Sequence, residues 1–105
     1  MRYREILSRA KKAGACKDYL EIAKKYKSLN DALRDPDAPY MACWYADNVI
    51  GGRWPEAEPL IMKEAGYAYL YAIHIIRGQW IEAEPVIRKY AEYWNRYKMH
   101  FKVNK

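Results

Sequence analysis

Cysteine is scarce in this chain of 105 residues, and its two cysteines, Cys16 and Cys43, lie in separate predicted helices. The sequence has no Cys-x-x-Cys spacing. Two cysteines without that spacing, in a chain without a secretion signal, indicate free thiols in a reducing cytoplasm.

Long apolar runs are also missing. No uninterrupted segment approaches the roughly 18 apolar residues that span a bilayer. The N-terminus, Met1 to Glu5, carries basic residues, but the apolar run of a secretion signal does not follow them. We therefore predict a soluble cytoplasmic protein without a membrane partner.

The sequence contains no nucleophile elbow, Gly-rich phosphate loop or His-x-x-x-His pair. His74 and His100 align with Asn48 in the internal repeat described below, but neither histidine has a Cys or carboxylate at ligand spacing. Helix packing or a satisfied hydrogen bond is the preferred interpretation of these positions. We expect no metal and no cofactor.

Paired glutamates occur at Glu56 and Glu58 and again at Glu82 and Glu84. Paired acids catalyse reactions where a desolvated pocket shifts one pKa. These four glutamates lie at predicted helix starts, where the helix dipole stabilises negative charge, and their pairing occurs twice, whereas an active site is ordinarily needed once. We predict no catalytic residue and a protein that is not an enzyme.

Tyrosine and tryptophan are abundant, with eleven Tyr and four Trp against one Phe. Such rings can pack at one end and meet water or a partner at the other. Tyr, Trp and Arg are also enriched in protein–protein hot spots. For the average ring in this chain, a place in the core of a small helical protein is the preferred interpretation.

The segment from Tyr45 to Ile61 is echoed in register by the segment from Tyr71 to Ile87, so position 45 corresponds to position 71. The repeat therefore has a period of 26 residues. Repeats of this length are typical of helical arrays in which each unit buries its apolar face against the next. We predict an all-α fold, a short solenoid-like bundle of about six or seven helices. The motif positions in the two copies are Gly52, Trp54, Glu56 and Pro59, and Gly78, Trp80, Glu82 and Pro85.

The repeat also divides the chain. We predict a single domain over residues 1–105, with atypical helices in 1–35, repeats over 36–62 and 63–89, and a last helix and tail over 90–105. Within it we expect short helices at Pro55–Met62 and Ile81–Lys89, and a helix at Tyr67–Arg77 that Gly78 ends. Apolar residues surround that helix, so it should be the most buried element. A final helix is expected at Ala91–Phe101.

Charge is segregated along the chain, whose formal net charge is +6. Residues 1–27 carry nine basic and three acidic residues, residues 28–85 four and nine, and residues 86–105 six and one. Basic ends and an acidic middle indicate an electrostatically selected partner, either an acidic protein surface or a nucleic acid. For any single lysine, a solvated helix face is the simpler explanation.

Tyr/Ala-rich predicted helices flank the segment Ile50-Gly51-Gly52-Arg53-Trp54-Pro55-Glu56-Ala57-Glu58-Pro59-Leu60-Ile61-Met62-Lys63. This segment resembles tandem repeats in small bacteriophage and prophage proteins. The resemblance covers about residues 36–95, and the second copy departs from it at Gln79 and Ile81. No activity is assigned to that repeat family. The resemblance implies a phage-type accessory protein in a bacterial host cytoplasm. By analogy, such a protein binds and inhibits host machinery or host defence, as anti-CRISPR proteins do.

Two functions follow from these patterns. The first is a non-enzymatic interaction module for a bacterial host protein or complex, with Tyr and Trp as anchors; the acidic middle favours it. The second is nucleic-acid binding through the basic terminal helices. A homo-oligomer is also possible, since basic ends could dock on the acidic centre of a second copy. The candidate partner-binding residues are Arg9, Lys12, Lys17, Lys24, Lys25, Lys27, Arg88, Arg96, Lys98 and Lys102.

Overall fold

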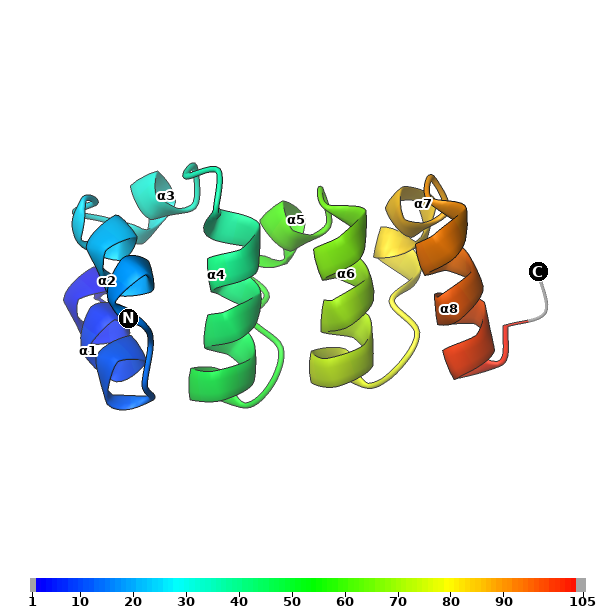
Figure 1. Ribbon diagram of the computed structural model, residues 1–105, viewed down its shortest axis with the longest axis horizontal. Coiled ribbons are helices and arrows are strands. Elements are labelled where there is room, and N and C mark those ends of the chain that lie inside the picture. Colours follow the sequence, from blue (N-terminus) through cyan, green and yellow to red (C-terminus); the bar gives the residue numbers. More distant parts are fainter. Residues whose placement is uncertain (1, 104–105) are drawn as a thin grey trace.

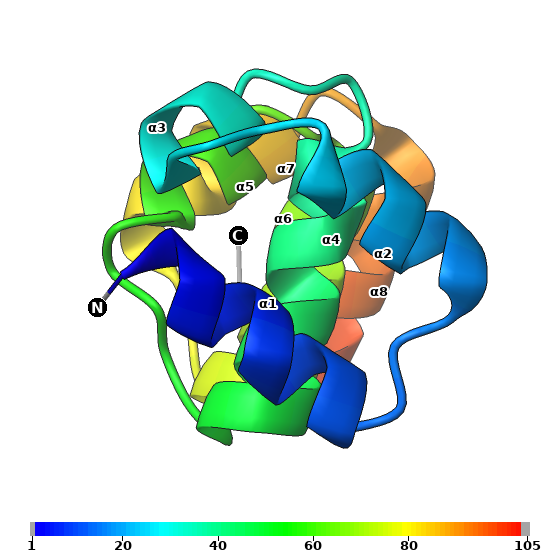
Figure 2. The same cartoon turned by 90° about the vertical axis from the view of Figure 1, so that its left-hand side faces the viewer.

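Two rows of helices make up the protein in a computed structural model that describes residues 2–103. Three longer helices, α4, α6 and α8, stand side by side, and the short helices α3, α5 and α7 lie behind them (Figure 1). Seen from one end, the members of each row lie one behind another (Figure 2). The molecule is therefore elongated, measuring 44 × 22 × 22 Å.

The row of longer helices contains α4 (Ala38–Tyr45), α6 (Ala65–Tyr71) and α8 (Ala91–Phe101). Both α4 and α6 continue into five-residue π-helical turns, η1 (Ala46–Ile50) and η2 (Ala72–Ile76). The other row contains α3 (Leu29–Ala32), α5 (Glu58–Ile61) and α7 (Glu84–Ile87), with a 3₁₀ turn, η3 (Ile81–Ala83), before α7. Proline occupies the first turn of α5 and of α7, where its missing N–H is not needed.

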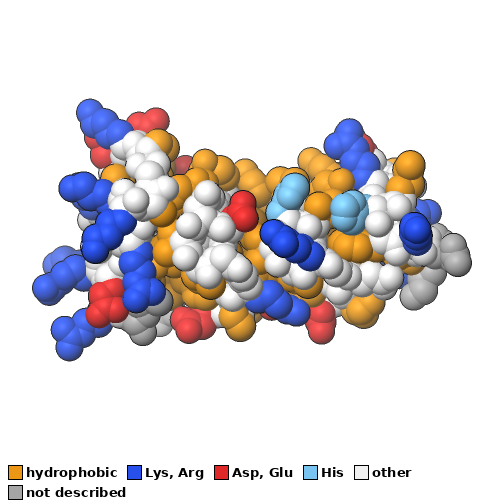
Figure 3. Space-filling model, turned by 90° about the horizontal axis from the view of Figure 1, so that it is seen from below, with side chains coloured by type: hydrophobic (Ala, Val, Ile, Leu, Met, Phe, Trp, Pro, Cys, Tyr) orange, Lys and Arg blue, Asp and Glu red, His pale blue; other side chains and the backbone are white. Residues whose placement is uncertain are grey.

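Helices α1 (Tyr3–Lys12) and α2 (Lys17–Lys24) close the N-terminal end of the molecule. Ile6, Ala10 and Tyr19 bury their side chains against Tyr45 of α4, and the Tyr3 hydroxyl donates to the Ala23 carbonyl at 2.6 Å. The outward sides of these helices are basic, and Lys and Arg side chains gather over this end (Figure 3).

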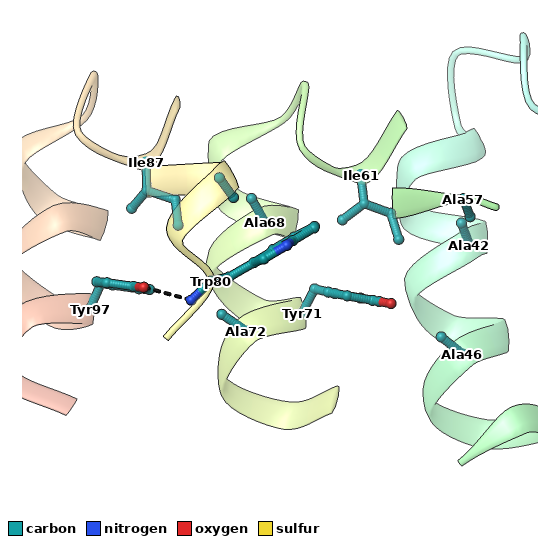
Figure 4. Close-up of a cluster of buried hydrophobic side chains, with 11 residues drawn as sticks. Ala42, Ala46, Ala57, Ile61, Ala68, Tyr71, Ala72, Trp80, Ile87 and Tyr97 are labelled. Atoms are coloured by element: carbon teal, nitrogen blue, oxygen red, sulfur yellow. Dashed lines mark hydrogen bonds between the residues drawn. The ribbon is translucent and has the colours of Figure 1, made fainter. Parts of the chain in front are cut away.

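In the core between the longer helices, small residues of one helix pack against large aromatic rings from the segment that follows this helix in the sequence. Ala68 of α6 and Ala72 of η2 are fully buried beside the Trp80 ring (Figure 4). Trp80 also packs against Tyr71, with ring centroids 4.8 Å apart. Trp54 packs against Tyr45 in the same way at 4.9 Å, so equivalent residues of the two sequence copies make the same contact.

Helix α8 lacks the small residues that face a ring in α4 and α6. In the register of the repeat, Ala42 and Ala68 correspond to Trp94. The Trp94 ring stacks on Tyr97 of its own helix at 5.4 Å. The guanidinium carbon of Arg88 lies over this ring, 4.8 Å from its centroid. Trp94 thus covers the C-terminal side of the core with a ring from α8 itself.

Several expectations about the elements need correction. The described residues contain eight α-helices, more than the six or seven expected. The segment expected as a helix from Pro55 starts its α-helix at Glu58, and the one expected at Ile81–Lys89 divides into η3 and α7. The helix at Ala91–Phe101 is confirmed.

The helix expected at Tyr67–Arg77 begins at Ala65 and is not buried all round. Its buried side consists of alanines and Tyr71, while Leu70 is 42% exposed. Gly78 does not end this helix; Arg77 does, in the left-handed conformation with φ of 59°. Gly51 holds the equivalent position after η1, with φ of 72°.

Within the described residues, no helix combines the length and the apolar character that crossing a membrane requires.

Replacing Arg77 by Gly should stabilise the protein. A left-handed backbone is strained for a residue with a Cβ and unstrained for glycine, so we expect the free energy of unfolding to rise by about 1 kcal/mol. Urea denaturation measures this change. The matched variant Gly51→Arg should lower stability by a similar amount. An unchanged or lower stability of Arg77→Gly would contradict the conclusion that the left-handed backbone strains Arg77.

Candidate functional site

The clustered glutamates divide into a buried pair and an exposed pair. Glu58 and Glu84 are buried, whereas Glu56 and Glu82 are exposed. The Tyr71 hydroxyl donates to Glu58 Oε2 at 2.7 Å and accepts the backbone N–H of Trp54 at 2.7 Å. The carboxylate therefore serves a hydrogen-bond bridge between α6 and the turn before α5, a larger role than the helix-dipole stabilisation expected from the sequence.

The same bridge occurs in the second copy of the repeat. The Tyr97 hydroxyl accepts the backbone N–H of Trp80 at 2.8 Å (Figure 4). It donates to Glu84 Oε2 at 2.8 Å. Sequence reasoning did not assign this role to Tyr71 and Tyr97. Their recurrence in register with Tyr45 was the available signal, because a polar ring kept at a buried position usually has a hydrogen-bond partner.

The two buried glutamates pair with cations from different positions of the repeat. Arg53 Nε and Nη2 bind both oxygens of Glu58, each at 2.8 Å. In the second copy Gln79 replaces that arginine, and Arg88 Nη2 lies 3.5 Å from Glu84 Oε1. Both buried carboxylates thus have a cation and a tyrosine hydroxyl as partners, which accounts for their burial as charged groups.

Protonation behaviour agrees with that role. Arg53 holds the pKa of Glu58 below its ordinary value, and the Tyr71 hydroxyl acts in the same direction, against the opposing effect of burial. Burial and the hydrogen bond to the carboxylate raise the pKa of Tyr71 and of Tyr97. Glu58 therefore remains ionised and both tyrosines remain neutral near pH 7.

Neither histidine takes part in a cluster. His74, His100 and Asn48 are all exposed, and both histidines are visible on the lower face of the molecule (Figure 3). The Asn48 side chain donates to the Trp44 carbonyl at 3.0 Å. In the described part of the chain, no three His, Cys, Asp or Glu side chains form a group suited to a metal ion.

The basic residues predicted to bind a partner fall at two separate ends. Arg9, Lys12, Lys17, Lys24, Lys25 and Lys27 are exposed on or beside α1 and α2. Arg88, Arg96, Lys98 and Lys102 lie on or beside α8 at the far end of the row (Figure 1). Arg96 pairs with Glu92 at 2.9 Å, and Lys98 lies 5.7 Å from the Trp94 centroid. The structure does not bring the two groups together.

Sequence reasoning missed a surface formed by α4, α6 and α8 together with the turns that precede α6 and α8. We call it the outer face and define it by its rings and its exposed leucine: Tyr40, Trp44, Tyr67, Leu70, Tyr90 and Tyr93. Tyr40, Leu70 and Tyr90 are exposed by 46, 42 and 57%. Tyr67 packs on Tyr40 with centroids 6.2 Å apart.

Two grooves run along the outer face and share Tyr67 and Leu70. The α4–α6 groove, with a volume of about 170 Å³, is also lined by Tyr40, Trp44 and His74. The α6–α8 groove, with a volume of about 640 Å³, is also lined by Tyr93 and Lys89. A hollow, ring-lined surface over three helices can accept protruding side chains from another molecule.

Comparison of equivalent positions in the sequence copies distinguishes this face from the core. Equivalent buried positions of the two copies hold the same residue, as at Ala57 and Ala83, or Ile61 and Ile87. On the outer face one register position varies, holding Trp44, Leu70 and Arg96, although Tyr67 and Tyr93 are equivalent and identical. The difference between the exposed Leu70 and its equivalents is the signal that could have located the face.

No family model, curated protein or solved structure matches this chain.

Replacing Arg53 by Gln, the residue at equivalent position 79, should reduce the acid sensitivity of the fold. A lowered pKa means that ionised Glu58 stabilises the folded state above the ordinary glutamate pKa of about 4.3, and that this stabilisation is lost as the pH falls through the lower folded-state pKa. We expect the variant to lose about 0.5–1.5 kcal/mol at pH 7 and to show a shallower pH dependence in acid. Urea unfolding at several pH values measures the stability loss and its pH dependence. Parallel plots of stability against pH for the wild type and Arg53→Gln would contradict the role of Arg53 in keeping Glu58 ionised.

Proposed function

We propose that this chain is a short helical-repeat array that acts as a non-enzymatic protein-interaction module. Each unit of the array spans one sequence repeat and pairs a longer helix with a short one. The recurring tyrosine–glutamate bridges and tryptophan contacts support this description, because the same residues make them in successive units. In arrays of this kind, stacked units provide an extended surface for a partner.

The observation that carries the proposal is the outer face. Tyr and Trp are the residues that most often anchor protein interfaces, and exposed rings around a hollow offer large contact area at low entropic cost. Leu70 lies at the junction of the two grooves and is exposed. A lone exposed leucine is ordinary, but one surrounded by rings between two grooves favours a binding role.

The resemblance of the Gly-Arg-Trp-Pro-Glu-Ala-Glu-Pro segment to repeats in small bacteriophage and prophage proteins extends the proposal. We take the protein to be a phage-type accessory factor, whose partner is a bacterial host protein and whose effect is inhibition of host machinery or host defence. This extension rests on the resemblance, while the interaction role rests on the outer face.

Nucleic-acid binding is the second candidate, and one observation favours it. The exposed basic side chains of α1 and α2 gather at one end of the molecule (Figure 3). Such a patch attracts phosphate backbones in a strongly salt-dependent way. It covers one end only, and the acidic residues of the middle segment interrupt any track along the array.

Leu70→Asp tests the interaction role. Because Leu70 is already partly exposed, we expect the fold to survive the change, with a loss of stability of about 1 kcal/mol or less, and the partner contact to be lost. Immobilised wild type should capture a protein from bacterial lysate that Leu70→Asp does not capture. Ile81→Asp is the matched control, since Ile81 is 59% exposed but lies in η3, outside this face.

Capture that is equal for all three proteins would contradict the proposal. So would binding of labelled DNA or RNA that weakens steeply with salt and disappears when Lys24, Lys25 and Lys27 are changed to Glu. That second result would establish the basic end as the functional surface.

A further inference from the structure

The α6–α8 groove is rich in hydrogen-bond donors that the protein itself does not use. The hydroxyls of four tyrosines in its lining make no hydrogen bond with another described residue; they are Tyr67, Tyr69, Tyr90 and Tyr93. The hydroxyls of the core-facing Tyr71 and Tyr97 behave differently, since each both donates and accepts within the chain. The tyrosines of the groove thus have hydroxyls available for a ligand.

The groove also holds two lysines at equivalent positions. Lys63 precedes α6 and Lys89 precedes α8, each by two positions in the sequence, and both are exposed. Neither makes an ion pair with another described residue. Arg96 lines the same groove but is paired with Glu92. Among the described residues that line the groove, Glu64 is the only carboxylate, so the groove has a positive balance.

The arrangement of the rings fixes where these donors lie. Tyr93 packs against Tyr69 at 5.8 Å and against Tyr90 at 6.1 Å. Its hydroxyl lies over the first turn of α6, only 3.2 Å from the place a Cβ on Gly66 would occupy. Glycine at this position therefore leaves room for the Tyr93 ring beside the backbone of α6.

We propose that the α6–α8 groove binds an acidic segment of a partner protein, a proposal that rests on the interaction role proposed above. Carboxylate side chains of that segment receive charge-assisted hydrogen bonds from the tyrosine hydroxyls and from the ammonium groups of Lys63 and Lys89. Apolar side chains between the carboxylates pack against the rings. The groove thus favours a ligand that offers hydrogen-bond acceptors and negative charge.

The ring contacts favour a protein segment over a single-stranded nucleic acid. Nucleic-acid bases bind by stacking on free aromatic faces, and Tyr93 already packs against two neighbouring rings. Glu64 would also repel a phosphate backbone that followed the groove. Separate carboxylates on a peptide can be spaced to reach Lys63 and Lys89 without a continuous line of negative charge past Glu64.

Selection from a displayed library of random peptides tests the proposal on the complete chain. We expect peptides selected on the wild type to be enriched in Asp and Glu, and the best of them, made synthetically, to bind at least about tenfold more weakly to Lys63→Glu/Lys89→Glu. Tyr93→Phe should weaken it by about threefold to tenfold, because only a hydroxyl is removed. Calorimetry and amide chemical shifts around Gly66 measure affinity and location.

Lys24→Glu/Lys25→Glu is the matched control, because it makes the same charge change at the other end of the molecule, and it should leave affinity nearly unchanged. The proposal is overturned if the selected peptides are not acidic, if their binding depends on Lys24 and Lys25, or if a single-stranded oligonucleotide competes for the groove. Neutral peptides whose binding is lost in Leu70→Asp would overturn it while leaving the interaction role intact. Failure of any peptide to bind the outer face, together with unselective capture from lysate, would count against both proposals.

Discussion

The hydroxyl of a buried tyrosine connects α6, and likewise α8, to the chain segment before it. In both copies it accepts the backbone N–H of a tryptophan and donates to a glutamate, over distances of 2.7–2.8 Å. A backbone N–H outside a helix and a buried carboxylate would each be costly without a partner, and one hydroxyl satisfies both. The positions of Trp54 and Trp80, and with them the packing of their rings, depend on this bridge.

The bridges and the alanine–tryptophan packing use the inward sides of the longer helices and leave Leu70 of the outward side exposed. The register position of Leu70 holds Trp44 in α4, which packs on Tyr19, and Arg96 in α8, which pairs with Glu92. The tyrosines are accordingly of two kinds, one hydrogen-bonded within the core and one presenting its hydroxyl to a groove. We infer that stability and recognition are assigned to opposite sides of the same helices.

The sequence was informative where local rules decide the structure and less so where tertiary contacts do. The all-α class, the last helix and the prolines in the first turns follow from periodicity and local chemistry. The burial of Glu58 and Glu84 does not, because it depends on hydroxyls 13 residues away. The exposed Leu70 was misplaced in the core since an apolar run does not reveal which side lacks a neighbour. The basic residues at the two ends stay predicted binding residues.

The unfolding free energy of Tyr97→Phe tests the tyrosine bridge most directly. The substitution keeps the ring and removes only the hydroxyl, leaving the Trp80 N–H and Glu84 without that partner. We expect a loss of about 1–3 kcal/mol, while the control Tyr90→Phe, whose side chain is 57% exposed, should change stability by less than about 0.5 kcal/mol. Equal, small effects of the two changes would contradict the account, because the fold would then not depend on the bridge.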